Sequence, residues 1–174
     1  MYRPGGCMTA GFFLYKGSKR GNTYRQEGCA VKVREVMQSP VICVGPGQTV
    51  ESAAKVLERY NVGALPVCTH QGVLCGMVTD RDLVVRCLAM GKAPSATCVQ
   101  EIMTRQVISV NPDMDAAVAA HLMGRKRIRR LPVVEHGAVR GIVSIDDLAA
   151  TEQNAYDAAD ALGEISAYFL QNKC

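Results

Sequence analysis

The sequence predicts an α+β (α/β-like) fold in which two copies of one small unit, each a three-stranded sheet with helices, pack as a pseudo-two-fold pair. The first observation is a stretch that occurs twice, as Gly76-Met77-Val78-Thr79-Asp80-Arg81-Asp82-Leu83 and as Gly141-Ile142-Val143-Ser144-Ile145-Asp146-Asp147-Leu148. The second is that the match extends backwards in register, from Leu131-Pro132-Val133 onto Leu65-Pro66-Val67. A repeat of this length indicates a duplicated structural unit.

The third observation is the size and composition of the chain. Its 174 residues are 48% hydrophobic and 21% charged, which is typical of a globular protein. One repeat of about fifty residues leaves one face of its sheet uncovered, whereas two repeats can bury a common apolar interior. Duplication therefore solves a problem of stability, and it creates two related sites.

The first repeat predicts six elements in the order helix, strand, helix, strand, strand and helix. In chain order they are residues 33–37, 41–44, 50–60, 65–68, 73–78 and 80–89. Pro40 stops the first helix, Thr49 is a suitable N-cap for the second, and Gly91 ends the third. Because residues 99–150 repeat this pattern, we expect the same six elements there.

The segments that flank the repeats have different patterns. Residues 1–30 match neither repeat, and we expect a loosely ordered arm that settles on the folded part through residues 12–15. Residues 149–170 predict one helix with an apolar stripe, which must cover either the module's own body or another chain. The expected domains are 1–30 (arm), 31–92 (first repeat), 97–150 (second repeat) and 151–174 (C-terminal helix).

Composition and missing motifs exclude several function classes. A net charge of +4 is too small to indicate nucleic-acid binding on its own. The eight cysteines include no C-x-x-C spacing, which favours a reduced, cytoplasmic protein without a metal site. No apolar run is long enough for a membrane helix. Because no nucleophile elbow, P-loop or H-E-x-x-H motif occurs, we do not expect an enzyme.

Each repeat contains a hydroxyl at the end of a strand and a carboxylate three residues later. These pairs are Thr79 with Asp82, and Ser144 with Asp147. The hydroxyl and the free N–H groups of the following turn suit a phosphate, and the carboxylate suits the hydroxyls of a ribose. The same spacing also fits a helix capping box, which needs no ligand. The motif alone leaves both interpretations open.

The run Arg125-Lys126-Arg127-Ile128-Arg129-Arg130 is the most charged stretch of the chain. Its first half fits a solvated helix end, where cations interact favourably with the C-terminal dipole. Arg129 and Arg130 differ, because they abut the apolar Leu131-Pro132-Val133 strand and must therefore point in a fixed direction.

Over residues 33–150 the chain resembles the cystathionine beta-synthase (CBS) domain pair, also called a Bateman module, in its stand-alone two-repeat form. In the first repeat the resemblance rests on Met37 with Val41-Ile42, on Gly63-Ala64-Leu65-Pro66-Val67, and on Gly76-x-x-Thr79-x-x-Asp82. In the second it rests on Met103, Arg130-Leu131-Pro132-Val133 and Gly141-x-x-Ser144-x-x-Asp147. Two such sets in register make the resemblance specific.

The resemblance implies a non-catalytic regulatory module. Such a module binds an adenosine nucleotide (AMP, ADP, ATP) or a related adenosyl ligand such as S-adenosylmethionine in the cleft between its repeats, and signals by conformational or oligomeric change. The implied ligand-binding residues are Thr79, Asp82, Ser144, Asp147, Arg130, Arg129, Ile42 and Ile108. The two isoleucines would wall the adenine, although a core position is the alternative for each.

The first repeat departs from the family pattern, since Gly63-Ala64 stand where Arg129-Arg130 stand in the second. Three alternatives remain open for the first site, which borrows Arg129, uses Arg81 or stays empty. We expect the Ser144/Asp147 site to be the tighter one.

The family also implies a homodimer formed through the helices after Leu83 and Leu148. No cofactor is required, and the effector protein that receives the signal is unknown. One alternative is a ligand-free interaction or stress-response protein, for which the hydroxyl-carboxylate pairs are helix caps only. A nucleic-acid binder is less favoured, because the predicted C-terminal helix is acidic.

Overall fold

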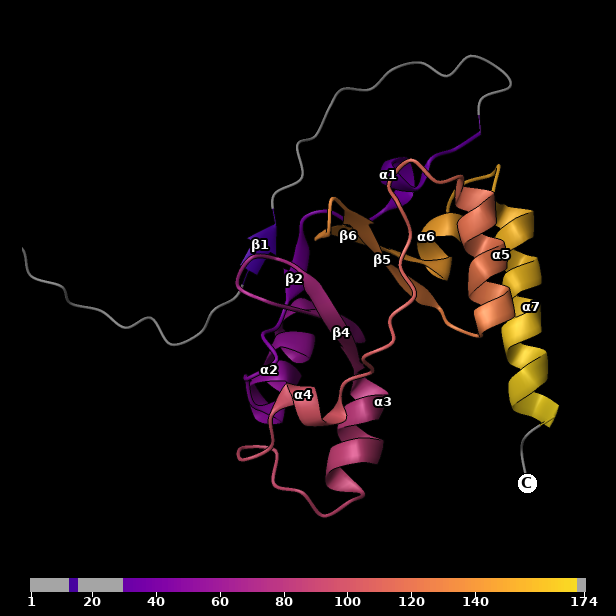
Figure 1. Ribbon diagram of the computed structural model, residues 1–174. Helices are drawn as coiled ribbons and strands as arrows, with labels where there is room; N and C mark the ends of the chain where they lie inside the picture. Colours follow the sequence, from indigo (N-terminus) through magenta and orange to yellow (C-terminus); the bar gives the residue numbers. More distant parts are fainter. Residues whose placement is uncertain (1–12, 16–29, 172–174) are drawn as a thin grey trace, which may run out of the picture. The chain divides into compact units, whose positions relative to one another are not determined.

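The computed structural model describes residues 13–15 and 30–171 and has a mixed α+β fold, as predicted (Figure 1). Its strands are β1 (Phe13–Tyr15), β2 (Val41–Cys43), β3 (Ala64–Cys68), β4 (Leu74–Thr79), β5 (Arg130–Glu135) and β6 (Ala138–Ser144). Its helices are α1 (Val33–Val36), α2 (Val50–Tyr60), α3 (Asp80–Asp82), η1 (Leu83–Leu88), α4 (Val99–Ile102), α5 (Ala116–Lys126), α6 (Ile145–Ala149) and α7 (Ala155–Gln171). Most of the expected N-terminal arm lies outside the described residues.

The chain forms two compact units that exchange their opening helices. Among the described residues, the first unit contains 13–14 and 42–105, and the second contains 15, 30–41 and 106–171. As a result α4, which opens the second repeat, packs in the first unit, where Val99 N donates to Gln48 O at 2.8 Å. Helix α1, which opens the first repeat, packs in the second unit, where Val33 N donates to Met114 O at 2.9 Å.

In the first unit β3 and β4 form an antiparallel hairpin in which Leu65 lies opposite Val78. The strand predicted at residues 41–44 joins this hairpin at one residue, through a parallel bridge from Val44 to Val67. Residues of the hairpin, α2, η1 and α4 together form the core of this unit. It contains Val44, Val50, Ala53, Val56, Leu57, Leu65, Val67, Val78, Leu83, Cys87, Val99, Ile102 and Met103.

The predicted helices of the first repeat are present with one change of type. The Thr49 side chain caps α2 by accepting from Ser52 N at 3.1 Å, as predicted. The helix predicted over 80–89 begins as α3 and continues as η1, in which each N–H bonds five residues back, as from Ala89 N to Val84 O at 2.8 Å. Gly91, at φ +67°, ends it as expected.

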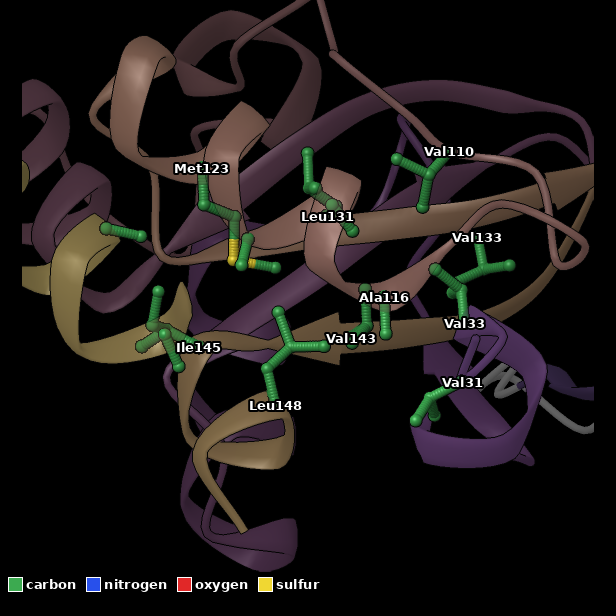
Figure 2. Close-up of a cluster of buried hydrophobic side chains, with 14 residues drawn as sticks. Val31, Val33, Val110, Ala116, Met123, Leu131, Val133, Val143, Ile145 and Leu148 are labelled. Carbon is green, nitrogen blue, oxygen red and sulfur yellow. The ribbon is translucent and has the colours of Figure 1, made fainter. Parts of the chain in front are cut away.

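The second unit is built on the β5/β6 hairpin, in which Leu131 lies opposite Val143. Figure 2 shows its apolar core, where side chains from α1, α5, both strands and α6 meet. The labelled members are Val31, Val33, Val110, Ala116, Met123, Leu131, Val133, Val143, Ile145 and Leu148.

The strand expected at residues 107–110 is reduced to one bridge, from Val110 to Val133. Its counterpart β2 is a strand because it pairs with β1. Within the described part of the chain, residues 107–109 have no such neighbour. The prediction of a strand there was wrong, because the local sequence is β-compatible but the pairing partner is missing.

The prediction of one continuous helix from Ala149 was also wrong. Ala149 ends α6, the chain then turns, and α7 begins only at Ala155. Side chains of the turn compete for the backbone: Thr151 Oγ1 donates to Leu148 O at 2.9 Å, and Asn154 Nδ2 donates to Thr151 Oγ1 at 2.8 Å.

Helix α7 runs beside α5 (Figure 1). Its apolar stripe buries Ala158, Ala161 and Ile165, so it covers the body of its own unit. Gly124 of α5 permits this approach, because a Cβ there would lie 3.1 Å from Ala161 Cα. The stripe therefore no longer supports a homodimer, and evidence for one must come from another surface.

Candidate functional site

The first hydroxyl-carboxylate pair lies where β4 passes into α3. Asp82 N donates to Thr79 Oγ1 at 3.1 Å, and Asp82 Oδ2 accepts from both Thr79 N at 2.9 Å and Thr79 Oγ1 at 2.7 Å. This is a complete capping box with Asp at the third position.

The second pair lies where β6 passes into α6 and repeats this geometry. Asp147 N donates to Ser144 Oγ at 3.1 Å, while Asp147 Oδ2 accepts from Ser144 N at 2.8 Å and from Ser144 Oγ at 2.5 Å. Both pairs therefore act as helix caps in this structure, which is the ligand-free interpretation of the motif.

The other carboxylate oxygen distinguishes the two pairs. Asp82 Oδ1 forms an ion pair with Arg86, at 3.3 Å from Nε, on the next turn of the same helix. Asp147 Oδ1 instead accepts a hydrogen bond from the neutral amide of Gln38, at 2.7 Å from Nε2. Oδ1 of Asp82 is thus paired with a cation, whereas Oδ1 of Asp147 accepts a hydrogen bond from a neutral amide.

Neither Arg86 nor Gln38 was among the predicted site residues. Arg86 could have been found, because the i, i+4 spacing from Asp82 places the two side chains on one helix face. Gln38 lies 109 residues from Asp147 in the sequence and reaches it only because α1 packs in the second unit. No local pattern indicates that contact.

Arg130 stands directly opposite Ser144 in the β5/β6 register. Residues that face each other across an antiparallel pair project to the same side of the sheet, so the exposed Arg130 and the half-buried Ser144 share one side of the hairpin at its end. At the matching place of the first unit Ala64 stands opposite Thr79. The first unit therefore lacks an arginine opposite its hydroxyl, as the sequence predicted.

The remaining predicted residues are less close to the pairs. Arg129 is exposed and precedes β5, where its carbonyl accepts from Ile145 N at 2.9 Å, and the register pairs only Arg130 with Ser144. Ile42 and Ile108 are half-buried and pack against the cores of the first and second units respectively.

The basic run behaves largely as a helix end. Arg125 and Lys126 are exposed in the last turn of α5. Arg127 takes the left-handed conformation that ends the helix, with φ 56°, and its guanidinium carbon lies 3.7 Å from the centre of the Tyr168 ring on α7. This stacking gives the arginine a structural role in the second unit.

All five cysteines of the described residues are free and lie in the first unit. The thiols of Cys43 and Cys68 are hydrogen-bonded, which lowers the pKa of Cys43 and raises the pKa of Cys68 well above its ordinary value. Burial raises the pKa of Cys75. Within residues 13–15 and 30–171 no group of three His, Cys, Asp or Glu side chains could hold a metal ion, and no helix is long and apolar enough to span a membrane.

The comparison with family models matches both halves of the chain to one family, described as the CBS domain, at residues 33–88 and 99–153. Among curated proteins, the CBS domain-containing protein YhcV of Bacillus subtilis is 42% identical over 134 residues, which span 77% of this chain and 94% of that protein.

Two solved structures are also similar. The CBS domain pair of protein MJ0100, in complex with 5'-methylthioadenosine and S-adenosyl-L-methionine, is 30% identical and superposes with a TM-score of 0.64 over 70% of this chain and 95% of that one. Hypoxic response protein I, with two coordinated zinc ions, is 32% identical with a TM-score of 0.65 over 69% of this chain and 98% of that one.

Proposed function

Since this chain belongs to the CBS domain family, we propose that it is a non-catalytic regulatory protein that binds an adenosyl ligand at the Ser144/Asp147 pair. The candidate ligands are AMP, ADP, ATP and S-adenosylmethionine. The observation that carries the proposal is the grouping of the exposed Arg130 with the half-buried Ser144 and Asp147 where the β5/β6 hairpin passes into α6.

The chemistry of these three side chains suits an adenosyl ligand. The Asp147 carboxylate can accept hydrogen bonds from the two hydroxyls of a ribose once Gln38 releases Oδ1. The guanidinium of Arg130 can bind a phosphate, or the carboxylate of S-adenosylmethionine, through two parallel hydrogen bonds. The complex of the MJ0100 domain pair supports this ligand class, because that relative holds two adenosyl compounds.

The two pairs are proposed to differ in affinity. At the first pair, Ala64 replaces the arginine and Arg86 already occupies the carboxylate. A ligand there would gain less charge attraction and would displace an ion pair. The second pair is therefore the expected binding site.

Isothermal titration with AMP, ATP and S-adenosylmethionine tests the proposal, using wild type, Asp147→Ala and Asp82→Ala. Both variants lose the same capping contacts, so Asp82→Ala is a matched control for stability. We expect saturable binding that Asp147→Ala abolishes and Asp82→Ala retains. Equal losses in the two variants would contradict the proposal. Flat traces for all three compounds would instead favour a ligand-free interaction protein whose pairs serve only as caps.

A homodimer through η1 is a second, separate part of the proposal. Val84, Val85, Leu88 and Met90 are all exposed apolar side chains on or just after this helix. The family's use of the helix after Leu83 as a dimer surface gives these side chains a partner, a second copy of the chain. Sedimentation equilibrium of Leu88→Glu beside Tyr156→Glu tests it: the first variant is expected to be a monomer, and the second, on α7, to remain a dimer. A wild-type monomer would contradict it.

A further inference from the structure

We infer that Arg86 acts as an internal occupant of the Thr79/Asp82 pair, which closes this pair to ribose and leaves the protein with one adenosyl site per chain. The inference rests on the proposed function and adds a regulatory residue to it. Arg86 would act through Asp82, as a positioning residue whose release opens a second site.

The contacts of Arg86 hold it over Asp82 from three directions. Its Nε lies 3.3 Å from Asp82 Oδ1, and its Nη1 donates to Ile102 O at 2.8 Å and to Thr104 Oγ1 at 3.1 Å. The acceptors come from α3, from Ile102 at the end of α4 and from Thr104, two residues beyond that end. The guanidinium is therefore fixed, although 46% of its side-chain surface remains exposed.

These contacts leave Asp82 with one acceptor site, on Oδ1 beside Arg86, where the two hydroxyls of a diol need two. Its Oδ2 lies within the capping box, its Oδ1 faces Arg86, and only 14% of its side chain is exposed. A ribose must displace the guanidinium, which then loses the ion pair with Asp82 and its hydrogen bonds to Ile102 O and Thr104 Oγ1. The loss of an ion pair together with two hydrogen bonds from a charged group reduces ligand affinity by about tenfold or more.

The second unit shows why the first needs an arginine. Gln38 and Thr104 occupy matching places, since each follows its repeat's methionine and forms a backbone bridge to the central residues of β6 and β4 respectively. The longer Gln38 reaches the carboxylate directly, at 2.7 Å from Asp147 Oδ1. In the first unit Arg86 contacts both Thr104 and Asp82, so it fills the gap that the shorter threonine leaves.

The position that matches Arg86 in the second repeat is Thr151, 65 residues later. Its hydroxyl donates to Leu148 O and accepts from Asn154, so it shapes the turn before α7. The cation is thus specific to the first unit. Releasing Gln38 costs one hydrogen bond from a neutral donor, whereas releasing Arg86 costs an ion pair and its bonds to two other acceptors.

Titration with adenosine and AMP tests this inference. Because adenosine has no phosphate, it distinguishes an Arg86 that blocks Asp82 from an Arg86 that binds the phosphate of the ligand. Arg86→Met keeps the apolar stem and removes the cation. Lys55→Met is the matched control, because it removes another i, i+4 ion pair, with Glu51, from the same unit. We expect one site in wild type and in Lys55→Met, and two sites for both compounds in Arg86→Met. The added site should disappear when Asp82→Ala is combined with Arg86→Met.

Thr104→Val is a second, milder variant, which keeps the inference testable if Arg86→Met fails to fold. It removes one acceptor of the guanidinium and leaves the ion pair, so affinity at the first pair should rise more weakly than in Arg86→Met. Thermal unfolding of each variant is measured alongside.

The outcomes separate this inference from the proposed function. A single site in Arg86→Met that Asp147→Ala removes overturns the inference and leaves the proposed function standing. No site in wild type but one in Arg86→Met, dependent on Asp82, upholds the closure of the first pair by Arg86 and overturns binding at Ser144/Asp147. No binding in any variant overturns both. Two AMP sites in wild type, one of them lost in Arg86→Met, overturn the inference by making Arg86 a phosphate ligand.

Discussion

The two units of this protein carry the same capping motif, but the carboxylate of the motif has a different partner in each. In the first, Asp82 is neutralised by Arg86; in the second, Asp147 is held by the amide of Gln38 and caps its helix with Ser144, the residue opposite Arg130. The caps are equivalent, so duplication has preserved the device that starts the helix. The groups around the carboxylate have diverged, and these groups determine whether it is available to a ligand.

The units also differ in how they are covered. Only the second is closed by a long helix after its repeat, α7, which packs on α5 and α6. In the first unit, the segment after η1 leads directly to α4. The second unit thus has a larger share of buried side chains beyond the repeat, and its stability should depend on them.

The largest expected effect comes from the buried stripe of α7. Ile165→Ala should lower the free energy of unfolding of the second unit by about 2 to 5 kcal/mol, because it leaves a cavity at a fully buried position. Tyr156→Ala, at a side chain that is 84% exposed on the same helix, should change it by less than about 0.5 kcal/mol. Urea unfolding followed by circular dichroism measures both. Equal effects would mean that α7 is not needed to cover α5.

A second comparison tests the glycines before the two pairs. A Cβ at Gly141 would lie 2.7 Å from Met37 Sδ and 2.8 Å from the carbonyl oxygen of Gln38, whereas a Cβ at Gly76 would meet Met103 Sδ most closely and lie 3.1 Å from Thr104 O. A methionine end can rotate away, but a backbone oxygen cannot.

Gly141→Ala and Gly76→Ala should each cost about 1 to 3 kcal/mol, with Gly141→Ala the more damaging. Thermal melts of the two variants rank them. The reverse order would show that the methionine sulfur, not the carbonyl, limits the space in each unit.

The carboxylate partners can be compared by double-mutant cycles on Asp82 with Arg86 and on Asp147 with Gln38. Each coupling energy should be about 0.2 to 1 kcal/mol, as for partly exposed pairs. The Asp82 coupling should shrink between 0.05 and 1 M salt, roughly the range over which exposed charges become screened, whereas the Asp147 coupling should not. A salt-independent Asp82 coupling would contradict the ionic description of the first unit.

The smallest expected effect concerns the thiols, which among the described residues occur only in the first unit. Burial raises the pKa of Cys75, so above about pH 9 the thiol ionises in the unfolded chain before it does in the folded one. Stability due to this group is therefore complete below pH 9 and declines as the pH rises further. Cys75→Ala should flatten that decline in urea unfolding between pH 8 and pH 10. An unchanged slope would assign the decline to other groups.

Local sequence patterns predicted the hairpins, the Thr49 cap of α2 and the Gly91 stop, because each depends on neighbours within a few residues. They also predicted both hydroxyl-carboxylate pairs and the missing arginine of the first repeat. They failed at residues 107–110 and at Ala149. A strand needs a partner, and the turn after α6 depends on Thr151 and Asn154 side chains that compete with the helix.

The sequence by itself determined the duplication, the fold class and the family, because these follow from periodicity and from motifs repeated in register. Only the tertiary structure decided which side chain contacts the second oxygen, Oδ1, of each carboxylate. The exchange of α1 and α4 between the units brings Gln38 to Asp147 and Thr104 to Arg86. Such contacts join residues far apart in the chain, and their distances follow from packing rather than from any local spacing.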